Sequence, residues 1–220
     1  MVGSLAGTGV GGVITWFAAE RRARGAEQQL IVQALASIRT ELLVGVNRIS
    51  SSIISAQAVI QSGQAPPVTD DLNLMYRTHA AVLHARLAPI DVLTVTAAYA
   101  WLMRYSRGGP ISGGPRRFAS VFQLYIEAVA ALYKAYMRIG EILETTSGLR
   151  AASDLAVFAL SADGIADACE RELKALSRPD ASADEREKVQ NIKAAAEWLM
   201  ADLRKNGFEE TEFKASCART

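Results

Sequence analysis

The chain contains few of the residues from which most active sites are built. It has two cysteines and two histidines among 220 residues, and neither pair has the spacing of a zinc site. His79 and His84 are five residues apart, about 140° around a helix axis, so both cannot bind one metal ion from the same face. Sequence motifs of metalloproteases, di-iron bundles, lipases and phosphate-binding loops are also missing. We therefore expect no metal, no cofactor, no catalytic residue and no enzyme activity.

The cysteines and the clustered acids have ordinary structural explanations. Cys169 is expected to be buried and Cys217 to lie in a tail, and this low cysteine content fits a reducing compartment. Asp163, Asp167 and Glu170 could present three carboxylates along one helix face. Such a row could bind a hard cation, but oxygen-ligand sites usually include loop carbonyls as well. A solvated face is the favoured interpretation.

Charge is distributed unevenly along the chain. Residues 1–120 hold eleven Lys/Arg and six Asp/Glu, whereas residues 121–220 hold thirteen and seventeen, and the formal net charge is +1. A general nucleic-acid-binding domain would be strongly basic, so we expect no nucleic-acid partner. Basic residues near the N-terminus suit a protein held at an anionic membrane surface.

The strongest feature is an uncharged segment, Val2 to Ala19, followed by Glu20 and by Arg21, Arg22 and Arg24. Its length is at the lower end of what spans a bilayer. Trp16 precedes the arginines, as aromatic residues do at membrane interfaces, and the positive-inside rule puts the following residues in the cytoplasm. We expect a single-pass anchor with its N-terminus outside.

Three alternatives to the anchor remain open. A cleavable signal peptide would carry its basic residues before the apolar segment, whereas here they follow it. The segment could also be a buried helix of a soluble protein, or an irregular glycine-rich tail.

Small residues recur along the anchor at every fourth position. Gly3, Gly7 and Gly11 form one ridge, with Gly12 on a parallel ridge beside it. Such ridges let two helices approach closely in lipid, which predicts a homodimer. Alternatively, the anchor is simply rich in glycine and weakly hydrophobic.

The rest of the chain is predicted to be helical. Apolar residues recur every three or four positions, and no convincing strand pattern occurs. The predicted fold is all-α, a transmembrane helix continuing into an antiparallel bundle, with an anchor and collar at 1–24, the bundle at 25–207 and a flexible tail at 208–220. The expected helices run from the anchor to Ser62, from a cap at Thr69 or Asp70 to Leu87, from Pro89 to Ser106, from Arg117 to Thr145, from Leu149 to Leu176, and from a capping box at Ser182–Glu185 to Asn206-Gly207.

The link at 107–117 is rich in glycine and proline and must be a loop. Arg104, Arg107, Arg116 and Arg117 surround it and could contact lipid headgroups or an acidic partner, unless it is a plain connection. The neighbouring helices carry tyrosines that we expect in the core with their hydroxyls near its rim. These are Tyr99, Tyr105, Tyr125, Tyr133 and Tyr136.

The first fifty residues resemble a recurrent type of small bacterial inner-membrane protein of uncharacterised function. The resemblance is carried by the glycine-rich anchor, the Glu-Arg-Arg collar and the stretch Ala34-Leu35-Ala36-x-x-Arg39-x-Glu41-Leu42, with Asn47 downstream. It implies a bacterial inner-membrane location and brings no catalytic residue with it.

Together these features favour a membrane-anchored cytoplasmic interaction or scaffold module. Its expected partners are membrane lipid, a second copy and an unknown protein. A membrane-disturbing or pore-forming effector that oligomerises through the glycine ridge is the main alternative. An enzyme that uses tyrosine and arginine in a bundle cavity would require a deep polar pocket lined by His79, Arg104 or Asp163.

Overall fold

A computed structural model of the protein describes residues 6–62, 73–106, 118–148, 154–177 and 182–209. Within these ranges, side chains are not described at 6–19, 22, 23, 54–62 and 106. The described residues form six α-helices and no strand, which confirms the predicted all-α class. The helices are α1 (Ala6–Ser62), α2 (Leu74–Arg86), α3 (Pro89–Ser106), α4 (Phe118–Ser147), α5 (Ala156–Ala175) and α6 (Ala183–Lys205).

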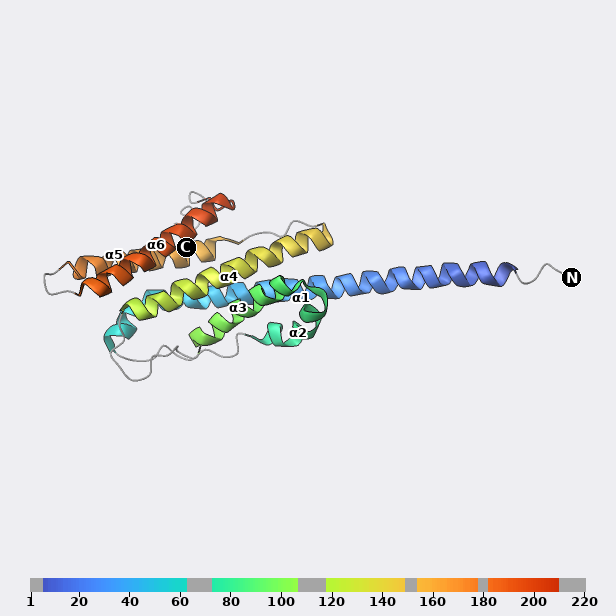
Figure 1. Ribbon diagram of the computed structural model, residues 1–220, viewed down its shortest axis with the longest axis horizontal. Coiled ribbons are helices and arrows are strands. Elements are labelled where there is room, and N and C mark those ends of the chain that lie inside the picture. Colours follow the sequence, from blue (N-terminus) through green and yellow to red (C-terminus); the bar gives the residue numbers. More distant parts are fainter. Residues whose placement is uncertain (1–5, 63–72, 107–117, 149–153, 178–181, 210–220) are drawn as a thin grey trace, which may run out of the picture.

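The helices pack in three layers (Figure 1). α1 and α4 form the middle layer, with α2 and α3 on one side and α5 and α6 on the other. α1 packs against α2, α4 and α5, whereas α4 packs against α3, α5 and α6. Every outer helix therefore contacts α1 or α4, which positions the two outer layers relative to each other.

The long helix predicted from the anchor to Ser62 is confirmed. α1 is one uninterrupted helix of 57 residues. Its second half belongs to the bundle, because one stripe of its side chains is buried, and its first half extends beyond the other helices (Figure 1). The buried apolar stripe comprises Ala34, Leu35, Ile38, Leu42, Val46, Ile49 and Ile53.

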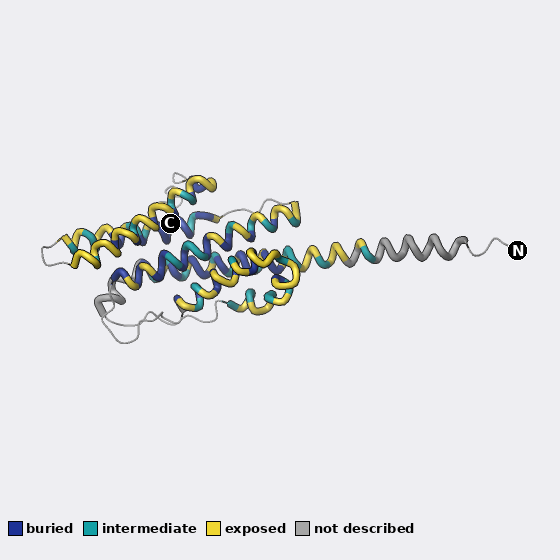
Figure 2. The backbone as a smooth tube through the Cα atoms, viewed as in Figure 1, coloured by how far each residue is buried: buried dark blue, intermediate teal, exposed yellow. Residues whose placement is uncertain are grey.

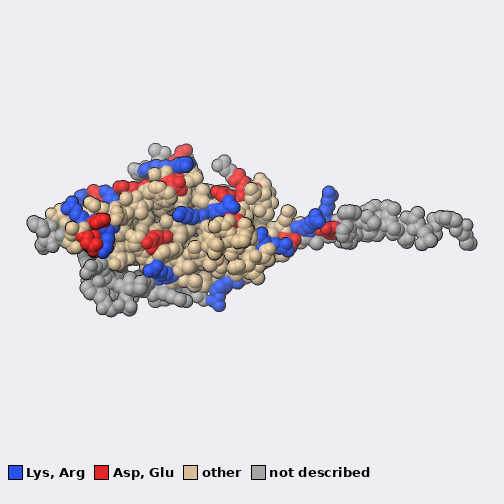
Figure 3. All heavy atoms as spheres, viewed as in Figure 1, with Lys and Arg blue, Asp and Glu red and all other residues tan. Residues whose placement is uncertain are grey.

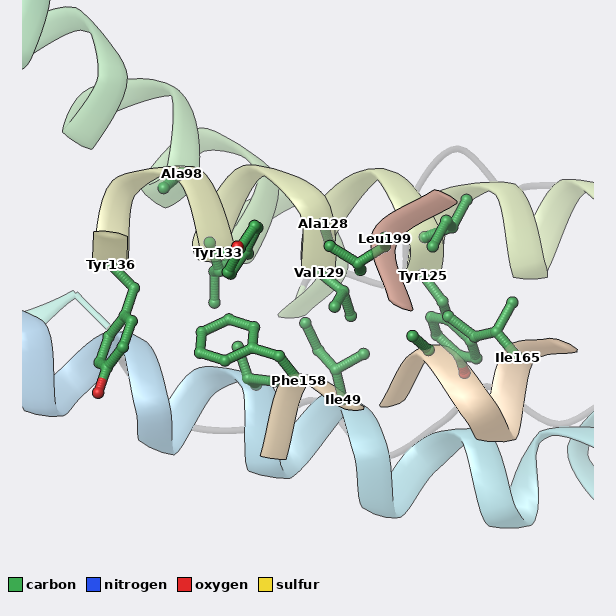
Figure 4. Packing of buried hydrophobic residues seen from close by; sticks show 14 of the residues in the cluster. Ile49, Ala98, Tyr125, Ala128, Val129, Tyr133, Tyr136, Phe158, Ile165 and Leu199 are labelled. Carbon is green, nitrogen blue, oxygen red and sulfur yellow. The ribbon is translucent and has the colours of Figure 1, made fainter. Parts of the chain in front are cut away.

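The core is centred on α1 and α4 and includes buried residues of α3, α5 and α6 (Figure 2). α4 contributes the most extensive buried face, which its aromatic and aliphatic periodicity predicted. Phe158 of α5 packs against Tyr133 and Tyr136 of α4, with ring centroids 5.5 and 5.2 Å apart (Figure 4). The five tyrosines expected in the core are all buried.

Two helix starts differ from the sequence prediction. α5 begins at Ala156 rather than at Leu149, because the preceding residues are held by tertiary contacts. The Asp154 N–H donates to the Tyr136 hydroxyl at 2.9 Å, and Leu155 is buried. The caps predicted for α2, Thr69 and Asp70, lie outside the described residues. α2 starts at Leu74, and its first N–H groups are bound by Glu41 of α1.

The C-terminal end of α6 differs from the sequence prediction at one residue, Phe208, which was predicted to begin a flexible tail. The Ser182 cap is confirmed, since its Oγ accepts from the Glu185 N–H. At the other end Gly207 has φ +96°, and the Phe208 N–H donates to the Leu203 carbonyl at 3.0 Å. This is a Schellman motif, in which the residue after the glycine makes an apolar contact. Phe208 is accordingly buried, so the bundle extends one residue further than predicted.

Candidate membrane-facing end and interaction surfaces

The N-terminal half of α1 leaves the bundle as a continuous helix (Figure 1). Glu27 of this half forms an ion pair with Arg86 of α2. From Ala6 to Ala19 the helix is uncharged and rises about 20 Å, at about 1.5 Å per residue, which is about two thirds of the bilayer hydrocarbon core. The rest of the uncharged segment, Val2 to Leu5, lies outside the described residues.

By length and composition α1 is a candidate membrane-spanning helix near the N-terminus. Among the residues with described side chains, the stretch that meets these criteria is Arg24–Ile53. Much of that stretch packs inside the bundle through Leu35, Ile38 and Leu42. It is therefore the core helix of the bundle, and the segment predicted to cross a membrane is the one before it.

The arginine collar lies between the projecting half of α1 and the bundle. Arg21 and Arg24 are exposed, and Arg24 forms a 2.5 Å ion pair with Glu20 one turn earlier. The side chains of Trp16 and Arg22 lie outside the description. So do those of Gly7, Gly11 and Gly12, and Gly3 precedes the described chain, so the predicted packing ridge stays a prediction.

The layer formed by α2 and α3 has an unusual charge distribution. From residue 72 to residue 126 the only acidic residue is Asp91. Its side chain is buried and paired with Arg138 of α4, with a separation of 2.6 Å between Oδ1 and Nε. Arg77, Arg86 and Arg104 are exposed on the same layer. Figure 3 shows this edge, at the bottom of the view, with basic patches and no acidic ones.

Exposed apolar side chains accompany these arginines. Leu74, Ile90 and Leu93 are among the most exposed large hydrophobic residues in the described chain. Trp101 is partly buried, and the Arg104 guanidinium lies over its ring, 4.9 Å from the centroid. A surface that combines arginine, tryptophan and exposed aliphatic residues has the composition of a protein interface.

The loop at 107–117, which was predicted as a candidate site for an anionic partner, lies outside the described residues. This range includes Arg107, Arg116 and Arg117. Arg104 is exposed at the end of α3 and belongs to the surface of the α2–α3 layer.

A groove of about 580 Å³ lies beside this layer, between α3, α4 and α6. Asp91, Arg138 and Glu141 form an ion-pair network at one end. At the other end Tyr133 donates to Asp202 at 3.0 Å. The remaining lining residues are Ile90, Thr94, Lys134, Met137 and Asn206.

The groove gives no support to the enzyme alternative. His79, Arg104 and Asp163, which that alternative required, do not line it. Hydrogen bonding to Asp91 and Glu141 raises the pKa of Arg138, so this guanidinium stays charged. Burial and Asp202 raise the pKa of Tyr133 to about 12, which makes it a poor proton donor or nucleophile at neutral pH. Arg138 is bonded to both Asp91 and Glu141, and Asp202 is bonded to Tyr133 and Asn206.

The other tyrosine hydroxyls also make structural hydrogen bonds. Tyr99 donates to Glu41, and the Tyr105 hydroxyl shares a hydrogen bond with Ser52. Burial is the largest cause of a raised pKa at both Tyr99 and Tyr105. These hydroxyls link helices, as expected of core tyrosines with a polar end.

Glu41 and Arg39 are among the polar residues that the sequence analysis missed. Glu41 is half-buried where α1 meets α2 and α3, and Arg39 is buried with its guanidinium 4.0 Å from the centroid of the Tyr136 ring. Both occur on the apolar side of α1, within the stretch that carries the resemblance. A charged residue inside an apolar stripe was the available signal for both.

The residues predicted to have ordinary structural roles behave as expected where they are described. Asp163, Asp167 and Glu170 are exposed, and Glu170 pairs with Lys174. Cys169 is fully buried, and burial raises its pKa to about 12.

The two histidines are on α2, and the second cysteine is near the C-terminus. His79 is half-buried and His84 is exposed on α2, while Cys217 lies outside the described chain. The described residues contain no group of three His, Cys, Asp or Glu side chains that could hold a metal ion.

Comparison of the chain with protein-family models, with curated proteins and with solved structures finds no match.

Proposed function

We propose that the protein is a non-enzymatic interaction or scaffold module anchored in a bacterial inner membrane by the N-terminal half of α1. The bundle lies on the cytoplasmic side, where it concentrates a protein partner at the membrane. The observation that carries this proposal is the projection of α1. One unbroken helix joins a packed bundle to a segment that extends beyond it and has no charged residue before Glu20 (Figure 1).

The collar supports the orientation. Arg21 and Arg24 are exposed and lie on the bundle side of the uncharged segment. Lysine and arginine next to a membrane span are retained on the cytoplasmic side. This orientation puts the bundle in the cytoplasm and the N-terminus on the opposite side.

The surface of the α2–α3 layer supports the interaction role. Arg77 and Arg104 provide positive charge without an exposed carboxylate on their own helices, and Leu74 and Leu93 provide apolar area. Complementary charge steers association and excludes partners of like charge. An acidic protein surface is the partner chemistry that fits.

Membrane fractionation tests the anchor. The full-length protein should remain in the pellet after alkaline carbonate washing and dissolve only in detergent. Replacing Val13 and Ile14 by lysine should release it into the supernatant, because each lysine in the middle of a span costs about 3 kcal/mol. A matched control with Ala194→Lys and Ala195→Lys, both exposed on α6, should stay in the pellet. A soluble wild-type protein would refute the anchor.

Cross-linking in membranes tests the interaction surface. Arg77→Glu with Arg104→Glu reverses the charge of the α2–α3 layer. The matched control, Arg171→Glu with Arg186→Glu, makes the same change at exposed positions on α5 and α6. We expect proteins that cross-link to the wild type and to the control to be lost from the first variant. The same captured proteins in all three samples would exclude this layer as the interaction surface.

A further inference from the structure

Exposed apolar side chains gather at the end of the bundle from which α1 emerges. Leu30 of α1 is 60% exposed, and Ile90 and Leu93 of α3 are 65% and 63% exposed. Ala88 and Pro89, which precede Ile90, are exposed as well. Large apolar residues exposed together usually mark a contact surface.

The ion pair between Arg86 and Glu27 defines the position of this end along α1. It places the corner between α2 and α3 beside the first turn of α1 that belongs to the bundle. From Ala19, the last residue of the uncharged segment, to Glu27 the helix rises about 12 Å. The headgroup layer of each leaflet is roughly 5–8 Å thick. The corner is therefore only a few ångströms beyond that layer if α1 stands upright.

Helix tilt and the short length of the span both bring this corner closer to the headgroup layer. Membrane-spanning helices tilt by about 20° on average. Such a tilt brings one side of an attached domain closer to the membrane surface. The uncharged segment from Val2 to Ala19 has eighteen residues, which is at the lower end of the length that spans a bilayer. A short span draws its flanking residues toward the bilayer. Both effects bring Ile90 and Leu93 to the level of the headgroups.

The composition of α3 fits contact with lipid. Between Asp91 and Arg104 it has no charged residue, although several of its positions are exposed. Arg86 at the corner is exposed but paired with Glu27, so it adds little net positive charge there. Glu141 and Glu144 are exposed on the last turns of α4, toward the same end. We therefore expect the apolar side chains to contribute more to the contact with lipid than electrostatic attraction does.

We propose that Ile90 and Leu93 rest in the headgroup layer of the bilayer that α1 crosses. This second contact restrains rotation and tilt of the bundle, so that the α2–α3 layer is presented at a fixed angle to partners. The inference rests on the proposed function, because it requires α1 to be the anchor.

Fluorescence quenching in lipid nanodiscs tests the contact. The full chain carries Cys217→Ser, and Cys169 is buried and does not react. A fluorophore is attached at Ile90→Cys, at Leu93→Cys or, as the matched control, at Leu160→Cys, an exposed leucine on α5. Gly164, one turn later on α5, is close to Ile53 of α1, which is about 39 Å further along α1 than Glu27. The control is therefore more than about 30 Å further along α1 than Glu27.

Lipid with a nitroxide on its headgroup should quench the fluorophore at Ile90→Cys and Leu93→Cys several-fold more strongly than at Leu160→Cys. Equal quenching at the three positions, with the protein retained in the disc, would overturn the contact and leave the anchor intact. A protein that does not enter the disc would overturn the anchor and the contact together. Helical circular dichroism of each labelled variant confirms that these exposed substitutions leave the bundle folded.

Discussion

Tyr99 of α3 donates its hydroxyl hydrogen to the Glu41 carboxylate of α1 at 2.5 Å. The same carboxylate accepts the backbone N–H groups of Met75 and Tyr76, at 3.0 and 3.2 Å, at the start of α2. The positive end of the α2 dipole thus faces a negative charge supplied by another helix. A single side chain of α1 holds both members of the α2–α3 layer.

Replacing Glu41 by alanine should loosen this layer. The substitution leaves two N–H groups and one hydroxyl in a partly buried site without their acceptor, and we expect a loss of about 2–3 kcal/mol in the free energy of unfolding. Hydrogen exchange should accelerate most in α2. Glu187→Ala, at an exposed position of α6, should change stability by less than about 0.5 kcal/mol. Unchanged exchange in α2 would exclude this capping role.

Gly45 permits the close approach of α1 to α3 and α4. A Cβ atom there would lie 3.0 Å from the Leu102 side chain and 3.1 Å from that of Leu132. Gly45→Val should therefore destabilise the bundle by about 1–3 kcal/mol through overpacking. Gly25→Ala is the matched control in the same helix, because a Cβ there meets nothing within 4 Å.

The control should be neutral or stabilising by up to about 1 kcal/mol, since alanine favours a helix more than glycine does. Urea unfolding in mild detergent, followed by circular dichroism, measures both variants. Equal stability of Gly45→Val and the wild type would show that α1 can move away from its neighbours at this point.

The helices were predictable because each has an apolar stripe with its own period. The buried positions of α6, from Val189 to Leu203, and the Ser182 cap follow from residues no more than a few turns apart. Gly207, which ends the same helix, was recognisable for the same reason. Local sequence was sufficient wherever the structure depends on local spacing.

The missed features depend on residues distant in sequence. Glu41 is 58 residues from Tyr99, and Asp91 is 47 residues from Arg138. Neither pairing leaves a periodic trace, because each requires the helices to be already placed beside each other. The start of α5 was missed for the same reason, since the Asp154 N–H is held by the hydroxyl of Tyr136.

Tyr133 should make the bundle sensitive to alkaline pH. Burial and Asp202 raise its pKa to about 12 from an ordinary value of 10.0. The unfolded chain therefore loses this proton at lower pH than the folded chain. The stabilisation is complete below about pH 10 and is lost as the pH rises through about 12.

Tyr133→Phe removes this titrating group. Although the variant also loses the hydrogen bond to Asp202, its free energy of unfolding should fall less than that of the wild type between about pH 9 and about pH 11.5. Urea midpoints at both pH values give the comparison. If the free energy of unfolding falls equally in the wild type and in Tyr133→Phe, another group controls unfolding at alkaline pH.

The glycine ridge of the anchor is predicted to mediate self-association. Gly7→Leu with Gly11→Leu places two large side chains on the ridge, so two helix backbones can no longer approach closely. The double substitution should reduce the signal of a dimerisation reporter fused to residues 1–24. Gly9→Leu with Val13→Leu is the matched control, since these positions lie on the opposite side of an ideal helix. It also adds hydrophobicity, mainly through Gly9→Leu, and should preserve the signal. If both pairs reduce it equally, glycine content rather than a ridge governs association, and if neither does, the anchor contributes no specific contact.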